Sequence, residues 1–281
     1  MKVHRKYTKV IIILVCIAAL AGGGLYNHVQ NQKLSVTFYH MDTEKNISGL
    51  RILELSDLHL KEFGPDNADL VKKVAALHPD IIAVVGDMTM EDNPDHSMVI
   101  RLVKRLTEIA PVFYSWGNHE YQDILYNKNS TLIKDMEEAG AICFDNKYVE
   151  VKVGRNKLKI GGVCKNAFDI LRYTGSQNML RKLSDEQGFT VLLSHYPEGF
   201  LSDMEGYPFD LVLCGHAHGG MVRLPFTDGL YSPDQGLFPK LTSGMRELCG
   251  STVVVSRGLG TSHSYEWRVN NRPEIVVVDV N

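Results

Sequence analysis

The chain has 281 residues, of which 44% are hydrophobic and 22% are charged, values that are ordinary for a folded globular protein. That length suits one large domain with a sizeable core behind an N-terminal targeting segment. The formal net charge of −3 argues against a basic surface that binds nucleic acid by bulk electrostatics. An anionic substrate would therefore have to be attracted locally, for instance by metal ions.

Cysteine usage indicates neither a zinc ribbon nor a redox motif, because no Cys-x-x-Cys pair occurs. The five cysteines are Cys16, Cys143, Cys164, Cys214 and Cys249. Cys143 and Cys164 end two apolar runs on neighbouring expected strands and could form a disulfide. The alternative, which we favour, is that all five are thiols, so the cysteines leave the cellular compartment open.

A membrane-targeting signal begins the chain. Its basic residues are Lys2, Arg5, Lys6 and Lys9. They precede a run from Val10 to Tyr26 that is apolar or glycine throughout. A basic flank followed by such a run predicts membrane targeting, with the remainder of the chain outside the cytoplasm. The predicted organisation is a basic cytoplasmic tail (1–9), a transmembrane anchor or signal sequence (10–27), a short polar stalk (28–33) and a domain (34–281).

Two interpretations of the apolar run remain open. An uncleaved anchor needs ~20 apolar residues, with a range of about 17–25, and the run is at the short end of that range. A cleaved signal peptide needs a small-x-small site, which Ala19-Leu20-Ala21 supplies. Because the residues after that site stay glycine-rich and apolar, we favour the anchor, with a cleaved and secreted domain as the alternative.

Strands and helices alternate through the first half of the domain. Ile81–Val85 is a fully apolar run of the kind found in buried parallel strands. Asn67–Leu77 carries its apolar residues at helical spacing, and a second helix is expected from Pro94. The other expected strands are Leu34–His40, Arg51–Ser56 and Pro111–Ser115. Strand-helix units in a row are typical of a parallel sheet.

The second half of the domain has more strands and longer loops. A helix from Leu132 to Ala139 is closed by Gly140, and residues 154–157 are expected to form a hairpin turn. The expected strands are Ala141–Phe144, Tyr148–Val153, Leu158–Val163, Phe189–Leu193, Phe209–Cys214, Thr252–Val255 and Glu274–Val280. Irregular segments are expected at 164–183, a candidate substrate-facing stretch, and at 221–246. The pattern predicts two packed sheets flanked by helices.

Polar side chains follow five of the expected strands. The motifs are Asp57-Leu58-His59, Gly86-Asp87, Gly117-Asn118-His119-Glu120, the lone His195 and Gly215-His216-Ala217-His218. Open α/β sheets bind ligands in the crevice outside the carboxyl ends of their strands. Carboxylate oxygen and imidazole nitrogen are ligands that divalent metals take from proteins. The sequence therefore predicts a metal site where these strands end.

The order of the motifs resembles that of the calcineurin-like metallophosphoesterase superfamily, over about residues 50 to 281. Within it, the chain is similar to the membrane-associated bacterial branch of phosphodiesterases and pyrophosphatases, whose last motif continues into a glycine-rich tail. The resemblance implies an α/β fold of two packed mixed β-sheets flanked by helices, a four-layer α/β/β/α sandwich. It also implies two divalent metal ions, Mn, Zn or Fe, and hydrolysis of a phosphodiester or diphosphate bond.

The family motifs assign a role to each matching residue. One metal would take Asp57, His59 and His218. The second would take Asn118, His195 and His216, with Asp87 bridging both. A hydroxide that bridges the metals would be the nucleophile. His119 would assist the leaving group, and Glu120, where many relatives carry Asp, would orient His119.

Contacts to the substrate are less well defined. Arg257 and His263 flank a glycine-rich stretch and could bind a phosphate or sugar; the alternative is a loop whose shape the glycines set. The membrane-associated branch suggests a small-molecule or lipid-linked phosphoester, such as a nucleotide-diphosphate lipid precursor. The competing function is a membrane-tethered binding or scaffold protein without activity. We favour the enzyme because every ligand position is filled. The expected partners are that substrate and the membrane, and the oligomeric state stays open.

Overall fold

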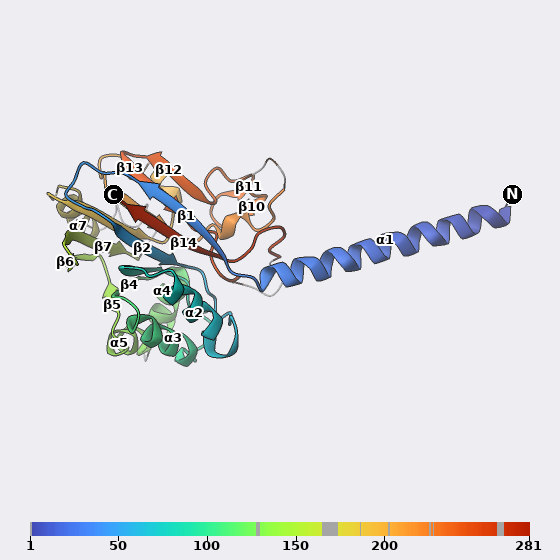
Figure 1. The fold of residues 1–281 in the computed structure, drawn as a ribbon, viewed down its shortest axis with the longest axis horizontal. Helices are drawn as coiled ribbons and strands as arrows, with labels where there is room; N and C mark the ends of the chain where they lie inside the picture. Colours follow the sequence, from blue (N-terminus) through green and yellow to red (C-terminus); the bar gives the residue numbers. More distant parts are fainter. Residues whose placement is uncertain are drawn as a thin grey trace.

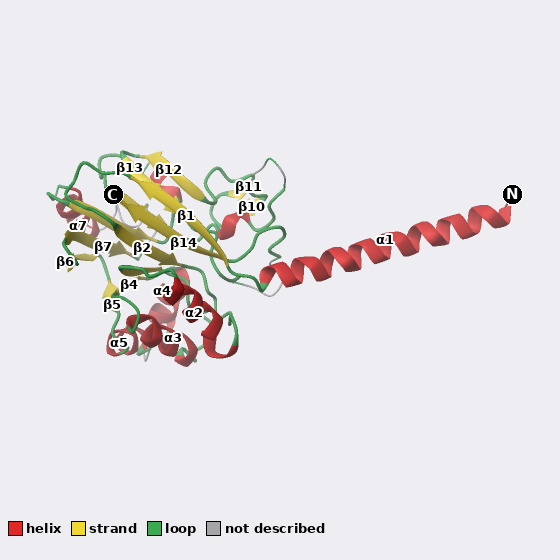
Figure 2. Ribbon diagram, viewed as in Figure 1, coloured by secondary structure: helices red, strands yellow, loops and turns green. Residues whose placement is uncertain are grey.

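The computed structural model describes the chain except residues 1, 128–129, 165–173, 186, 202, 225, 227 and 263–266. In the described residues, a long N-terminal helix leads into a body in which two six-stranded sheets pack face to face (Figure 1). Helices pack against the outer face of each sheet (Figure 2). The predicted four-layer α/β/β/α sandwich is thereby confirmed.

The first sheet has the strand order β1-β14-β2-β3-β4-β5. Its strands are β1 (Ser35–Met41), β2 (Leu50–Leu55), β3 (Ile81–Val85), β4 (Val112–Ser115), β5 (Ile142–Phe144) and β14 (Glu274–Val280). Neighbouring strands are parallel except for β14 and β2. The helices between these strands are α2 (Ala68–Ala76), α3 (Ser97–Thr107), α4 (Asn118–Tyr126) and α5 (Leu132–Glu138). Strands β2, β3, β4 and β5 thus run in one direction and end at one edge, whereas β1 and β14 run the opposite way.

The second sheet has the strand order β12-β13-β9-β8-β7-β6. Its strands are β6 (Lys147–Val153), β7 (Asn156–Val163), β8 (Phe189–Ser194), β9 (Leu211–Cys214), β12 (Gly244–Leu248) and β13 (Ser251–Val255). The edge pairs are antiparallel, whereas the four central strands are parallel. Helix α7 (Thr174–Ser184) packs on its outer face. The centre of this sheet therefore also delivers its strand ends to one edge.

Strand β3 explains why the two layers need an uninterrupted apolar sequence. Ile81, Ala83 and Val85 belong to the core between the sheets, whereas Ile82 and Val84 belong to the core under α2 and α3. Each of these side chains is fully buried. A strand covered on both faces has no solvent-facing side, so its run of five apolar residues is what the fold requires.

Helix α1 (Lys2–Asn31) extends away from the body (Figure 1). Its part Ile11–Asn31, 21 residues with a mean hydropathy of 1.8, is long and apolar enough to cross a membrane. The helix continues through residues 28–31, where the sequence suggested a polar stalk. The side-chain amides of Asn27 and Asn31 each donate to the Arg268 carbonyl oxygen at 2.8 Å. The end of the helix is therefore fastened directly to the domain.

Several elements differ from those expected. Helix α4 begins at Asn118, and a hairpin of β10 (Tyr231–Ser232) and β11 (Gly236–Leu237) interrupts the expected loop. The short 3-10 turns are η1 (Pro65–Asn67), η2 (Glu198–Leu201) and η3 (His218–Gly220). Cys143 and Cys164 are not joined by a disulfide; the Cys164 thiol donates to Asp145 Oδ1 at 3.4 Å.

Candidate metal centre

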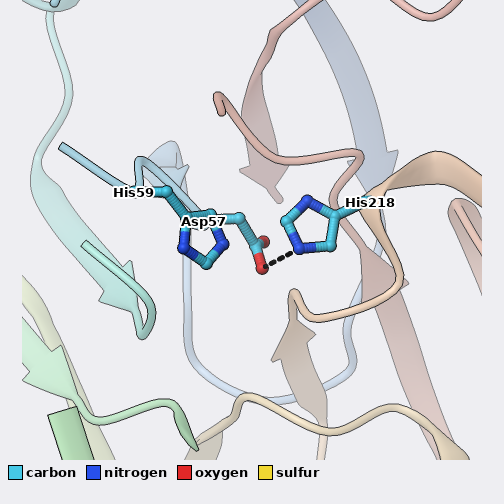
Figure 3. A group of neighbouring side chains, drawn as sticks. All are labelled: Asp57, His59 and His218. Atoms are coloured by element: carbon cyan, nitrogen blue, oxygen red, sulfur yellow. Dashed lines mark ion pairs between the residues drawn. The ribbon is translucent and has the colours of Figure 1, made fainter. Parts of the chain in front are cut away.

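The five predicted motifs meet at one place because five parallel strands end there. β2, β3 and β4 of the first sheet deliver Asp57, Asp87 and Asn118. β8 and β9 of the second sheet deliver His195 and the Gly-His-Ala-His motif. Figure 3 shows Asp57, His59 and His218 with their functional groups pointing toward one another. The site thus spans the seam between the two sheets.

The ligating atoms form overlapping groups that share Asp87 and His59. Within each group, one potential ligand atom per residue lies within 4.8 Å of the others. The groups are Asp57 with His59 and His218, His59 with Asp87 and His119, and Asp87 with His195 and His216. His195 Nε2 lies 3.1 Å and His59 Nε2 3.8 Å from Asp87 Oδ2. Asp87 therefore stands between two sets of imidazoles, as expected of a bridging ligand.

The donor atoms are buried, and several have no hydrogen-bond partner among the described residues. They are Asp57 Oδ2, both ring nitrogens of His59, Asn118 Oδ1, His195 Nε2 and His218 Nδ1. A buried polar atom without a partner is costly and rare in a native protein. Oxygen and imidazole nitrogen are suitable ligands for divalent ions, which would supply the missing partners. The residues present thus fit a metal centre.

Hydrogen bonds to backbone groups hold the side chains of the site in their orientations. His195 Nδ1–H donates to the Val85 carbonyl at 2.8 Å, which leaves Nε2 facing Asp87. Asp57 Oδ1 accepts from the backbone N–H of His216 at 2.9 Å, and Asp87 Oδ1 accepts from that of His119 at 2.9 Å. Such outer bonds fix the tautomer and direction of metal-binding side chains.

The backbone of the site is strained where the side chains converge. Asp57, His59, Asp87, His216 and His218 all have φ between 47° and 63°, in the left-handed region. Non-glycine residues adopt this region rarely, at a cost of roughly 1–3 kcal/mol each, and such strain concentrates at functional sites. The fold therefore holds these residues against their local preference.

Two motif glycines permit the close approach of the strand ends. Gly86 has φ 74°, and a Cβ there would lie 2.7 Å from His195 Nδ1. A Cβ on Gly117 would lie 2.7 Å from the backbone nitrogen of Asp87. A side chain at either position would push the two sheets or the two loops apart, so glycine precedes Asp87 and Asn118 for steric reasons.

Attraction between His195 and Asp87 favours the charged form of both groups. Burial disfavours charge on both groups, but their attraction outweighs it, raising the pKa of His195 to about 10 and lowering the pKa of Asp87. Burial and the charge of Arg268 instead lower the pKa of His218 to about 3. Burial also lowers the pKa of His59. Neutral His59 and His218 are in the form that ligates metal.

Glu120 has a different position from the one predicted. Its carboxylate is fully buried and accepts from the backbone N–H groups of Asp87, Met88, Thr89 and Gly117 at 2.7–3.1 Å. It also accepts from the Tyr114 hydroxyl at 2.9 Å. These bonds tie the loop after β3 to the start of α4. Glu120 thus supports the backbone of Asp87 rather than orienting the His119 ring.

One carboxylate that contacts the His119 ring, Glu91, was not predicted from the sequence. His119 Nδ1 faces Glu91 Oε2, while His119 Nε2 lies 3.9 Å from Asp87 Oδ2. Glu91 follows the Gly-Asp motif by four residues in a loop, and no periodicity distinguishes it from a solvent-exposed carboxylate. The sequence therefore contains no pattern that would predict the pairing of Glu91 with His119.

Four of the candidate metal ligands, Asp87, Asn118, His216 and His218, line a cleft of about 670 Å³. Its lining includes Asp87, Glu91, Asn118, Gln122, His119, His216, His218, Tyr231 and Trp267. A second missed carboxylate, Asp234, reaches the same site, with Oδ2 3.1 Å from His216 Nε2. The cleft is thus walled by α4 on one side and by the β10–β11 region on the other.

Arg257 and His263 are the two residues expected to contact the substrate. Arg257 pairs with Glu274 at 2.8 Å and lines a separate hollow beside α1 rather than the cleft at the candidate metal centre. His263 lies outside the described residues.

A family model described as calcineurin-like phosphoesterase matches residues 50–220. The chain belongs to this family. Metallophosphoesterase YkuE of Bacillus subtilis is 27% identical over 98% of this chain and 96% of its own length. Phosphodiesterase YaeI of Escherichia coli is 26% identical over 84% of this chain and 83% of its own. UDP-2,3-diacylglucosamine pyrophosphatase LpxG of Chlamydia trachomatis is 25% identical over 83% and 86%.

These relatives confirm the predicted superfamily. With the family assigned and the ligand residues gathered in one cleft, the chain is a metal-dependent phosphoric ester hydrolase. The alternative of a tethered scaffold without activity has no support in the comparisons.

Proposed function

We propose that this phosphoesterase hydrolyses a phosphodiester or diphosphate bond at the extracytoplasmic surface of the membrane, using two divalent ions. The observation that carries the proposal is the convergence of buried, unpaired ligand atoms on both sides of Asp87. One ion would be held by Asp57, His59 and His218. The other would be held by Asn118, His195 and His216, and Asp87 would contact both. Bound ions of this kind supply an activated water and neutralise phosphate charge.

His119 is proposed to protonate the leaving oxygen. Its Nε2 borders the cleft beside Asp87, and its Nδ1 is engaged by the Glu91 carboxylate. The carboxylate is placed to accept the Nδ1 proton and so to orient the ring. Nε2–H can then donate to the oxygen that departs from phosphorus, as expected of a general acid.

Asn118 and the walls of the cleft support an anionic phosphate substrate that carries a second arm. A neutral amide oxygen leaves the positive charge of a bound ion uncancelled, where an aspartate would reduce it. The side walls formed by Gln122, Tyr231 and Trp267 leave room for a second arm on the phosphate. Among the relatives, YaeI is named a phosphodiesterase and LpxG a pyrophosphatase, which supports both bond types.

The proposed location rests on the N-terminal segment. The apolar helix follows a basic flank, which favours retention of that flank in the cytoplasm and export of the domain. A nucleotide-diphosphate lipid is a second candidate substrate, which the similarity to LpxG favours. In that case the scissile bond would join two phosphates rather than a phosphate and an alcohol.

The test is a substrate panel with the purified full-length enzyme. We expect bis-p-nitrophenyl phosphate to be cleaved with added Mn²⁺, and the metal-chelated enzyme to lose that activity. A panel of monoesters, diesters and pyrophosphates then compares kcat/KM. Turnover of monoesters alone would contradict the diester proposal while leaving the metal centre intact.

A further inference from the structure

Large apolar side chains are exposed on the segment beside the cleft. Leu237 and Phe238 of the β10–β11 hairpin are 68% and 69% exposed, and Trp267 on the neighbouring loop is 73% exposed. Phe226 is fully exposed, and Leu224 is half-exposed. Scattered exposed apolar residues are ordinary, but several on adjoining segments mark an interaction surface. We call Leu224, Phe226, Leu237, Phe238 and Trp267 the apolar rim.

The two segments that carry the apolar rim are joined to each other. Val222 forms a parallel bridge with Val269, and the Arg223 N–H donates to the Val269 carbonyl at 3.0 Å. The Phe238 N–H donates to the Leu230 carbonyl at 2.9 Å, which closes the hairpin onto the same region. Tyr231 and Trp267 also line the cleft. The apolar rim therefore borders the mouth of the metal site.

The same region holds the end of helix α1. Asn27 and Asn31 donate to Arg268, and Asn270 donates through its side chain to the Arg223 carbonyl at 3.2 Å. A continuous path of hydrogen bonds thus runs from α1 through the loop at 268–270 to the base of the apolar rim. In Figure 1, β10 and β11 lie at the end of the body from which α1 leaves.

The length of the membrane-spanning segment and its contacts with the domain indicate how close the apolar rim lies to the bilayer. The 21 residues of Ile11–Asn31 extend ~31 Å as a helix, close to the ~30 Å hydrocarbon core. Asn27 and Asn31 belong to this span and already contact the domain. The contacts leave no linker between membrane and domain, so the face that holds α1 must lie at the headgroup layer.

We propose that the apolar rim docks onto the lipid bilayer that α1 crosses, with the mouth of the cleft at headgroup depth. The occupant is the acyl and headgroup boundary, where Trp and Phe side chains are favoured. The docking follows from the position of α1 and does not depend on catalysis. Resting on the proposed function, it further assigns the substrate class: an amphiphile whose phosphodiester or diphosphate enters the cleft while its tails stay in the bilayer.

The two tryptophans of the chain make the docking measurable. Trp267 lies on the apolar rim, whereas Trp116 is 8% exposed inside the domain. The full-length protein is reconstituted in phosphatidylcholine and phosphatidylglycerol vesicles with or without bromine on the upper acyl chain. We expect brominated lipid to quench a large part of the emission of the wild-type protein. Trp267→Phe, which keeps Trp116, should lose most of that quenching.

A matched control places a tryptophan at a similarly apolar exposed site on the other side of the body. Ile142 on β5 is 38% exposed, and β5 lies on the side of the body away from α1 (Figure 1). Ile142→Trp in the Trp267→Phe background should stay unquenched. Equal quenching of Trp267 and of the tryptophan at position 142, or none at either, would overturn the docking. Absent quenching together with a dimeric mass would assign the rim to a second copy of the chain.

A functional arm tests the substrate class. Leu237→Ser with Phe238→Ser alters the apolar rim but not the residues that line the cleft. This variant should cleave a vesicle-embedded phospholipid or lipid diphosphate on the order of tenfold more slowly, because less apolar area enters the bilayer. Its cleavage of bis-p-nitrophenyl phosphate should match the wild type. Equal loss on both substrates would overturn the assignment. If the wild type cleaves neither, the proposed function fails while quenching still decides the docking.

Discussion

At the residue scale, the carboxylates around Asp87 have separate tasks that their positions in the sequence do not reveal. Glu120 lies one residue after His119 yet accepts backbone N–H groups from the Asp87 loop. Glu91 lies four residues after Asp87 in the same loop yet reaches the His119 ring. The convergence of the candidate ligands could be predicted because each of their motifs follows an apolar strand. The two supporting carboxylates could not, because their partners depend on how β3 and β4 pack.

The Glu91–His119 pair predicts a dependence on the leaving group. Glu91→Gln should retain metal and lower kcat about 10–100-fold for an alkyl ester, and His119→Ala should lower it roughly 10²–10⁴-fold. Both losses should shrink for p-nitrophenyl esters, whose leaving group needs no proton. The double variant should be no slower than His119→Ala. Loss of metal from His119→Ala would make His119 a ligand instead.

The hydrogen bonds of Glu120 predict that its removal lowers the stability of the fold rather than changing the chemistry of the site. Glu120→Ala leaves the N–H groups of Asp87, Met88 and Gly117 without a buried acceptor, so unfolding should become easier by at least ~3 kcal/mol. Tyr114→Phe, which removes one donor to the same carboxylate, should cost only about 1 kcal/mol. Denaturant unfolding measures both. A stable Glu120→Ala variant with impaired leaving-group chemistry would restore the orienting role.

At the scale of elements, strands buried on both faces could be predicted well, whereas short or exposed elements could not. β3 and β9 are uninterrupted apolar runs, and β8 is apolar except for Thr190 and Ser194, as their central positions require. β10 and β11 have two residues each, too few for any period, and β12 is an exposed edge strand. Helix α4 begins with the motif residues Asn118, His119 and Glu120, whose polarity is typical of a turn.

Strand β2 contains an exception to its apolar pattern, and this predicts a pH effect. Glu54 is fully buried, and its carboxylate oxygens have no hydrogen-bond partner among the described residues. Burial, Glu274 and Asp57 raise the pKa of Glu54 well above its ordinary value. The folded state therefore binds a proton more tightly than the unfolded state. Stability from this proton is full below the unfolded pKa of about 4.3 and is lost as pH rises through the folded value.

Glu54→Gln removes the buried carboxylate and should raise Tm at pH 8. At that pH the fold of the wild-type protein is destabilised by the unfavourable burial of the Glu54 carboxyl group. Near pH 4.5 the wild-type side chain is largely protonated, so the two proteins should differ much less. Calorimetry across this range gives the comparison. A Tm difference that is constant with pH would mean that packing rather than charge explains it.

At the scale of the whole molecule, the sequence predicted the order of layers and the membrane-targeting segment but not how the two are joined. The layers follow from the alternation of strands and helices, which is local information. The attachment of α1 to the loop at 268–270 joins positions more than two hundred residues apart, and the polar residues 28–33 suggested a loose stalk. The proposed orientation of the cleft toward the membrane depends on this attachment.

The proposed topology predicts that the domain is outside the cytoplasm. Protease added to spheroplasts should digest the domain while cytosolic control proteins stay intact. A mature N-terminus at Gly22 would replace the anchor by a cleaved signal. Protection of the domain from protease would reverse the orientation.

The central claim is that Asp87 bridges two metal ions that the strand ends hold together, and metal stoichiometry tests it most directly. Elemental analysis of the purified full-length wild-type protein should give two divalent ions per chain. The Asp87→Asn variant should bind one ion or fewer per chain and lose diester hydrolysis. The Glu91→Gln variant should still bind two ions. An Asp87→Asn variant that keeps both ions and full activity would contradict the account, as would a metal-free wild type that hydrolyses the diester.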